Sequence, residues 1–140
     1  MPGTSTGLQD FTVNVKIKLA GLWASLMFCY IYGDYFELYV PGKTEGLVNG
    51  KNLLDSPAKL FAATLLLTIP SLMICLSLLL KPRVNRMLNI VWGAFYAALM
   101  LLIAVTSFSE WRLFYVFLAL TETILAITIL VTAVKWPKNM

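Results

Sequence analysis

Glu122 is the residue whose type and position in this sequence point most strongly to chemistry. It lies near the middle of an apolar run from Leu113 to Val134, and about 20 apolar residues suffice to cross a bilayer. An acid at that depth costs about 2.5–3.5 kcal/mol on insertion scales. The cost is lower if the acid is protonated, paired, hydrated or turned toward other helices. At helical spacing its face also holds Ala119, Ala126 and Ala133. Because small residues let a neighbouring helix approach, we expect Glu122 to point into a bundle.

Three further apolar runs accompany this one. The 140 residues are 59% hydrophobic and 13% charged, whereas soluble domains carry about 25% charged residues. The sequence therefore predicts an all-α membrane protein, an antiparallel bundle of four transmembrane helices. A flexible tail (1–12) is expected before this single domain (13–140), with helices at about 13–39, 58–80, 87–107 and 113–134. The connection between the second and third helices is short, which predicts that these two pack as a hairpin.

The distribution of basic residues predicts the orientation in the membrane. If the N-terminus is inside, seven Lys and Arg residues lie in inner segments and four lie in outer ones. Short inner loops of membrane proteins carry the excess of Lys and Arg, which favours N-in/C-in. We expect a multi-pass protein of the cell inner (plasma) membrane, with the lipid bilayer as its first partner.

A second polar feature lies in the predicted second helix, at Pro70. A proline inside a helix removes one hydrogen bond, here that of the Leu66 carbonyl, and kinks the helix. Nearby hydroxyls, waters or a neighbouring helix must then satisfy this carbonyl. Pro70 and Glu122 are each central in their spans. We therefore predict an intramembrane polar node formed by Glu122, Thr68, Pro70 and Ser71.

The predicted first helix ends in an outer acidic-aromatic cluster. Its members are Tyr30, Tyr32, Asp34, Tyr35 and Glu37. Tyrosines suit a membrane–water interface, and acids spaced i, i+3 share a helix face. The cluster fits either an interfacial belt with two solvated acids or an acidic vestibule that holds a cation.

An inner basic loop is predicted between the second and third helices. Its members are Lys81, Arg83, Asn85, Arg86 and Asn89. Each basic residue near an anionic membrane surface gains about 1 kcal/mol. Arg83 and Arg86 are therefore expected either to contact lipid headgroups or to serve in setting topology alone.

Taken together, these segments resemble a family of small bacterial four-transmembrane-helix proteins of uncharacterised function. The resemblance covers most of the chain and rests on Tyr30-Ile31-Tyr32-Gly33-Asp34, Ile69-Pro70, Arg83-Val84-Asn85-Arg86 with Asn89, Glu122, and Lys135-Trp136-Pro137. It implies a fold and a compartment, and no activity. Thr68 stands where that family often has an acid before the Ile-Pro pair. A more distant likeness to DoxX-like proteins concerns architecture only.

The composition narrows the function classes. The chain has no histidine, and it lacks Cys-x-x-Cys, a phosphate-binding glycine loop and a metal-ligand cluster, so no enzyme, metal or cofactor is predicted. The basic residues flank apolar runs, so nucleic-acid binding is not predicted either. One hypothesis is a structural or accessory bundle, in which Glu122 fixes helix packing through hydrogen bonds to Thr or Ser. The alternative is proton-coupled transport or intramembrane small-ligand binding centred on Glu122 and the Pro70 kink. Transport is expected to need a homo-oligomer, because four helices enclose little volume.

Overall fold

The computed structural model describes residues 7–138, so the predicted tail at 1–12 lies partly outside the described residues. The elements in chain order are α1 (Val15–Glu37), α2 (Lys43–Val48), α3 (Pro57–Leu79), α4 (Pro82–Thr106), the 3-10 helix η1 (Glu110–Arg112) and α5 (Leu113–Val134). Within residues 7–138, four helices are long and apolar enough to cross a membrane, the last of them counted from η1 through α5. A helix of 23 residues is about 35 Å long, which exceeds the roughly 30 Å hydrocarbon core.

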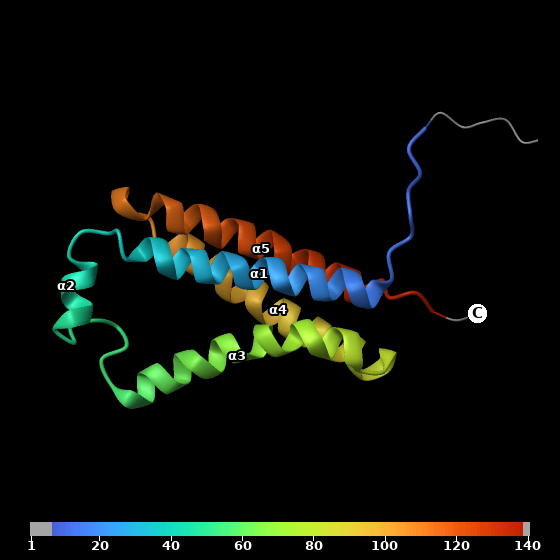
Figure 1. Ribbon diagram of the computed structural model, residues 1–140, viewed down its shortest axis with the longest axis horizontal. Helices are drawn as coiled ribbons and strands as arrows, with labels where there is room; N and C mark the ends of the chain where they lie inside the picture. The colour runs from blue at the N-terminus through green and yellow to red at the C-terminus, as the bar shows by residue number, and fades with distance from the viewer. Residues whose placement is uncertain (1–6, 139–140) are drawn as a thin grey trace, which may run out of the picture.

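The four long helices lie side by side and α2 sits across one end of the bundle (Figure 1). This α2 end holds the end of α1, the start of α3 and the connection between α4 and α5. The far end holds the start of α1, the connection between α3 and α4 and the end of α5. The predicted four-helix membrane bundle is therefore confirmed.

Local chemistry explains where the helices begin. The side-chain oxygen of Asn14 accepts a hydrogen bond from the Lys16 N–H (2.8 Å) at the start of α1, and Ser56 does the same for Lys59 (3.1 Å) in α3. A proline at the first helical position suits the start of a helix, because no N–H is needed there. Pro82 takes this position in α4, so α4 begins five residues before the predicted start at 87.

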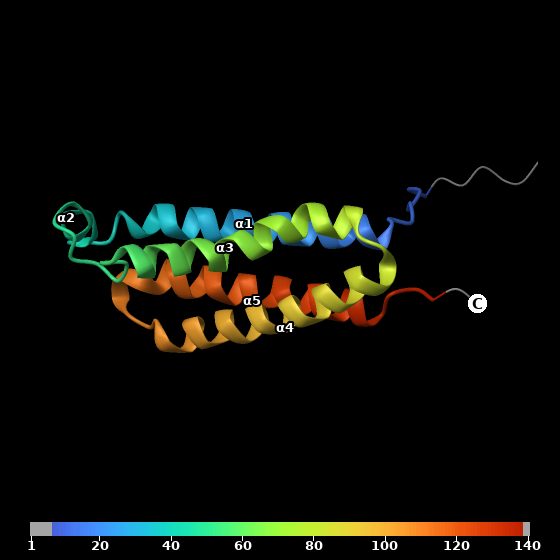
Figure 2. The same cartoon turned by 90° about the horizontal axis from the view of Figure 1, so that it is seen from below.

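α5 lies against both α4 and α1 (Figure 2). The predicted inward face of α5 is confirmed, because Ala119, Glu122, Ala126, Ile129 and Ala133 are all buried. Small residues allow this close packing. At Gly93 of α4, an added Cβ atom would come within 3.2 Å of the backbone nitrogen of Leu130. The contact between α4 and α5 therefore depends on the absence of a side chain at position 93.

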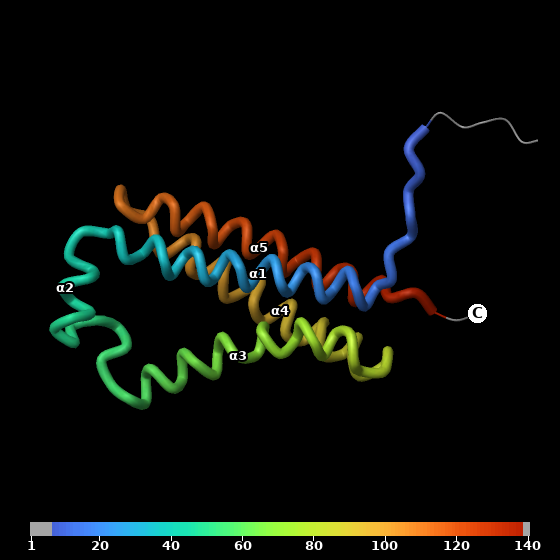
Figure 3. Tube along the Cα trace, viewed as in Figure 1, coloured from blue at the N-terminus to red at the C-terminus, as the bar shows by residue number. Residues whose placement is uncertain are grey.

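The predicted hairpin of the second and third helices is wrong. α3 packs mainly along α1 and has little contact with α4. The buried residues of α3 are Pro70, Met73 and Ser77, all in its second half. The Cα trace shows the first half of α3 diverging from α1 toward the α2 end (Figure 3). The kink at Pro70 lets the second half complete the core while the first half stands away from it.

Candidate intramembrane binding site

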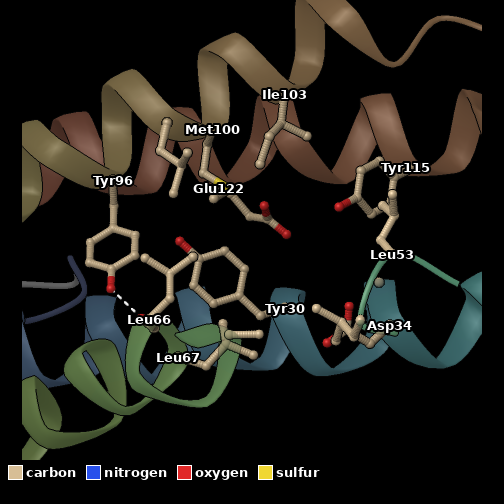
Figure 4. A pocket seen from close by; sticks show the side chains of 14 residues that line it. Tyr30, Asp34, Leu53, Leu66, Leu67, Tyr96, Met100, Ile103, Tyr115 and Glu122 are labelled. Atoms are coloured by element: carbon tan, nitrogen blue, oxygen red, sulfur yellow. Dashed lines mark hydrogen bonds between the residues drawn. The ribbon is translucent and has the colours of Figure 1, made fainter. Parts of the chain in front are cut away.

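A cavity of about 410 Å³ lies between the first half of α3 and the other three long helices. Its walls are mainly apolar, and α3 contributes Ala63, Leu66 and Leu67. Five polar side chains also line it, namely Tyr30, Asp34, Tyr96, Tyr115 and Glu122. Figure 4 shows these groups spread along the cavity, with Asp34 and Tyr115 near the α2 end and Tyr96 at the opposite end. We refer to it as the Glu122 cavity.

Glu122 occupies the middle of this cavity. The residue is 6% exposed, and no hydrogen bond or ion pair to its carboxyl group is found within residues 7–138. Figure 4 shows the carboxyl group turned into the cavity, as is the hydroxyl group of Tyr30. That hydroxyl is buried and has no hydrogen-bond partner. Buried polar groups are normally hydrogen-bonded, so these two groups without partners mark the cavity as a candidate binding site.

Tyr96 closes one end of the cavity and satisfies the carbonyl that Pro70 leaves free. Its hydroxyl donates a hydrogen bond to the Leu66 carbonyl oxygen, four residues before the proline. A neighbouring helix was one of the partners expected for this carbonyl. The sequence contained a signal for Tyr96 itself, because it is a phenol near the centre of an apolar span. Tyr115, by contrast, resembles an ordinary interfacial tyrosine.

The predicted polar node around Pro70 does not form as proposed. The Thr68 hydroxyl donates to the Thr64 carbonyl (2.7 Å), and the Ser71 hydroxyl donates to the Leu67 carbonyl (3.0 Å). Both residues are exposed and neither lines the Glu122 cavity. Residues one or two positions from Pro70 are rotated about 100° or 200° around the helix. Because the ring of Pro70 faces the core, its neighbours face outward.

The structure divides the outer acidic-aromatic cluster by helix face. Buried Tyr30 and exposed Asp34, one turn apart, line the Glu122 cavity, whereas Tyr32 and Tyr35 are exposed and do not line it. Glu37 is buried and forms an ion pair with Arg112 of η1. The predicted pairing of Asp34 and Glu37 around a cation therefore competes with an existing ion pair.

A second hollow of about 360 Å³ continues from the Glu122 cavity at the α2 end. The two share Asp34, Leu53, Leu54 and Tyr115. Glu37 lines this hollow together with its cationic neighbours, Arg112 and Lys43, the latter 3.8 Å away. The hollow is lined by two acidic and two basic residues, so its net charge is zero. Of the two acids, Asp34 has no basic residue within ion-pair distance.

The predicted inner basic loop is instead the first two turns of α4. Asn85 and Asn89 are fully buried, and the Trp23 indole N–H donates to the Asn89 side-chain oxygen (2.7 Å). Asn89 donates in turn to Asn85 (2.7 Å), which donates to the Ser77 carbonyl (2.7 Å). These bonds join α1, α3 and α4 at the far end. We call the four residues Trp23, Ser77, Asn85 and Asn89 the asparagine network.

The charged residues of the predicted inner basic loop also differ in their surroundings. Lys81 precedes α4 and Arg83 is exposed in its first turn. The Arg86 guanidinium donates to the carbonyl oxygens of Ala133 (3.1 Å) and Val134 (3.2 Å) at the end of α5. Helix ends leave such carbonyls without partners, so Arg86 caps α5. The contact of Arg83 and Arg86 with lipid headgroups stays a prediction.

The fold and the cavity define an all-helical, multi-pass membrane protein with an internal, mostly apolar cavity that holds an acid. Comparison with known proteins gives the family. The chain belongs to the Family of unknown function (DUF6326), whose model matches residues 8–140. No curated protein and no solved structure matches the chain. The function of this family is unknown, so membership of the family assigns no activity to the chain.

Proposed function

We propose that this protein binds a small organic molecule inside the membrane, in the Glu122 cavity. The observation that carries the proposal is an unpaired carboxyl group facing a cavity of about 410 Å³ with mainly apolar walls. Binding sites for small molecules measure roughly 300–1,000 Å³ and combine apolar walls with a few polar groups. An intramembrane acid is costly, which favours a functional reason for its presence. The proposal includes no catalytic step.

The accessory hypothesis, in which Glu122 fixes helix packing, has less support. It depends on hydrogen bonds from Glu122 to Thr or Ser on other helices, and the described residues contain none. The asparagine network instead links three helices through buried hydrogen bonds. With helix register held at the far end, the Glu122 carboxyl remains free for a ligand.

The second hollow adjoins the cavity at the α2 end, so we expect a ligand to enter from that end. Toward the far end the bundle is filled by fully buried side chains, among them Leu19, Trp23 and Asn89. One-sided access fits a binding protein, and it equally fits one state of a proton-coupled transporter. The cavity forms within one copy of the chain, so binding requires no homo-oligomer.

Two adjacent alanines of α3 provide a direct test. Ala63 lines the cavity, whereas Ala62 is exposed and does not line it. We expect Ala63→Trp to fill the cavity and to lower saturable binding of benzyltrimethylammonium, neopentylbenzene and benzenesulfonate at least tenfold. Ala62→Trp should bind as the wild type does. Equilibrium binding to protein in lipid nanodiscs, with empty nanodiscs as background, measures this.

The proposal of a binding cavity fails if none of the three probes binds saturably. It also fails if Ala63→Trp and Ala62→Trp bind the probes equally well. Thermal unfolding of both variants in nanodiscs checks that a loss of binding at Ala63→Trp reflects a filled cavity and not an unfolded chain.

We further propose that the protein lies in the plasma membrane with the far end inside, which is the N-in/C-in orientation. The support is the excess of basic residues at that end. Asn85 is buried and unsuitable as a reporter, whereas Gln9 and Asn49 are exposed at opposite ends. In a background with Cys29 and Cys75 replaced by alanine, an impermeant maleimide should label Asn49→Cys on intact cells. Gln9→Cys should react only after the cells are lysed. The reverse pattern would show the opposite orientation.

A further inference from the structure

We infer that the ligand of the Glu122 cavity is an organic cation with an apolar body. This inference rests on the proposed function and adds the chemical class of the ligand. It follows from the charge of the cavity, from one unpartnered hydroxyl group and from the nature of the walls.

The charge of the cavity is the first observation. Its ionisable groups are two carboxyl groups and three tyrosines, and no Lys or Arg lines it. Neither Glu122 nor Asp34 has a basic group within ion-pair distance within residues 7–138. Glu37 shows the contrast, because two cations of this chain already surround it. A charged carboxylate in an apolar site is stabilised when a cation pairs with it, and no residue that lines the cavity supplies one. A cationic ligand would fill this role.

The Tyr30 hydroxyl is the second, independent observation. Tyr30 is 7% exposed, and its oxygen is buried without a hydrogen-bond partner. Figure 4 shows this hydroxyl pointing toward the Tyr96 end of the cavity, whereas the carboxyl group of Glu122 points toward the Tyr115 end. A phenol oxygen has lone pairs to accept a hydrogen bond from an ammonium group. Tyrosine rings also attract cations, and quaternary ammonium ligands are commonly held by aromatic side chains.

The residues that line the cavity disfavour anions and hard metal ions as ligands. Anions meet two carboxyl groups and no basic partner in this cavity. A hard metal ion such as calcium needs about 6–8 oxygen ligands, and the described residues contain no group of three or more acids, cysteines or histidines that would hold one. Leu66, Leu67 and Met100 offer apolar surface. An apolar body gains free energy by contact with that surface.

The test compares three aromatic probes that differ in charge. Benzyltrimethylammonium carries a permanent positive charge, neopentylbenzene has the same shape without charge, and benzenesulfonate is negative. We expect the cation to bind wild-type protein in nanodiscs at least tenfold more tightly than either of the others. Glu122→Gln should weaken binding of the cation about tenfold to hundredfold, because interactions with a buried charged group are strong. Asp34→Asn, at an exposed position, should weaken it roughly twofold to fivefold.

Glu110→Gln is the matched control. Glu110 is an exposed acid of η1 outside the cavity, and its replacement changes the net charge equally. Binding of the cation to this variant should remain within twofold of wild type. If the neutral or the negative probe binds wild type as tightly as the cation does, the inference is overturned. Loss of binding in Ala63→Trp would still support the cavity, so the two failures are distinguishable. The wild-type probe comparison and Asp34→Asn decide the matter even if Glu122→Gln does not fold.

Discussion

Replacement of Asn89 by alanine is expected to lower the free energy of unfolding by about 2–4 kcal/mol. The Asn89 side chain accepts a hydrogen bond from the Trp23 indole N–H (2.7 Å) and donates one to Asn85 (2.7 Å). All three residues are fully buried. A buried polar group left without a partner costs about 1–3 kcal/mol, and this substitution leaves three such groups, on Trp23, Ser77 and Asn85. Unfolding of the purified protein by denaturing detergent in mixed micelles measures the effect.

A double-mutant cycle assigns the effect to the hydrogen bond itself. Trp23→Phe removes the indole N–H, so Asn89→Ala should cost about 1 kcal/mol less in that background than in wild type. Asn49→Ala, at an exposed loop position, serves as the control and should change stability by less than about 0.5 kcal/mol. Equal losses from Asn89→Ala in the two backgrounds would show that the asparagine network does not stabilise the bundle through this contact.

The parts of the fold that the sequence predicts correctly are those that depend on the spacing of residues along one helix. Apolar runs long enough to cross a bilayer predict four helices, because a chain in lipid must satisfy its backbone within each helix. The small residues beside Glu122 predict the inward face of α5, which the structure confirms. Both predictions depend on local spacing along one helix. Helical periodicity is visible in the sequence.

The predictions that depended on contacts between helices were less successful. The short connection predicts hairpin packing of the second and third helices, but the first half of α3, before Pro70, diverges from the bundle (Figure 3). The sequence predicts Thr68 and Ser71 in the node because they flank Pro70 at the expected depth of Glu122. Depth does not specify direction around the helix, and their hydroxyls bond to their own helix. Tyr96 fills the role expected of them, through a contact 30 residues distant in sequence.

The basic segment before the third predicted helix illustrates a different limit. Asn85 and Asn89 lie among charged residues, one turn apart at the inner end of the third predicted helix, and the sequence groups them with the inner basic loop. In the structure they are fully buried because Trp23 and Ser77, from two other helices, satisfy their amides. From the sequence alone a polar side chain is expected to be exposed, because its hydrogen-bond partners on other helices are not known. The same reasoning separates Glu37, paired with Arg112, from Glu122, which has no partner of this kind.

The central claim is that the Glu122 cavity holds a small ligand, and protection of a cysteine at its wall tests this most directly. In protein with Cys29 and Cys75 replaced by alanine, Ala63→Cys places a thiol on the cavity wall. Benzyltrimethylammonium at ten times its Kd should slow alkylation of this thiol by N-ethylmaleimide about tenfold, because occupied protein is shielded. Alkylation of Asn49→Cys, at an exposed position outside the cavity, should keep its rate. An unchanged rate at Ala63→Cys in the presence of the saturating probe would contradict the claim.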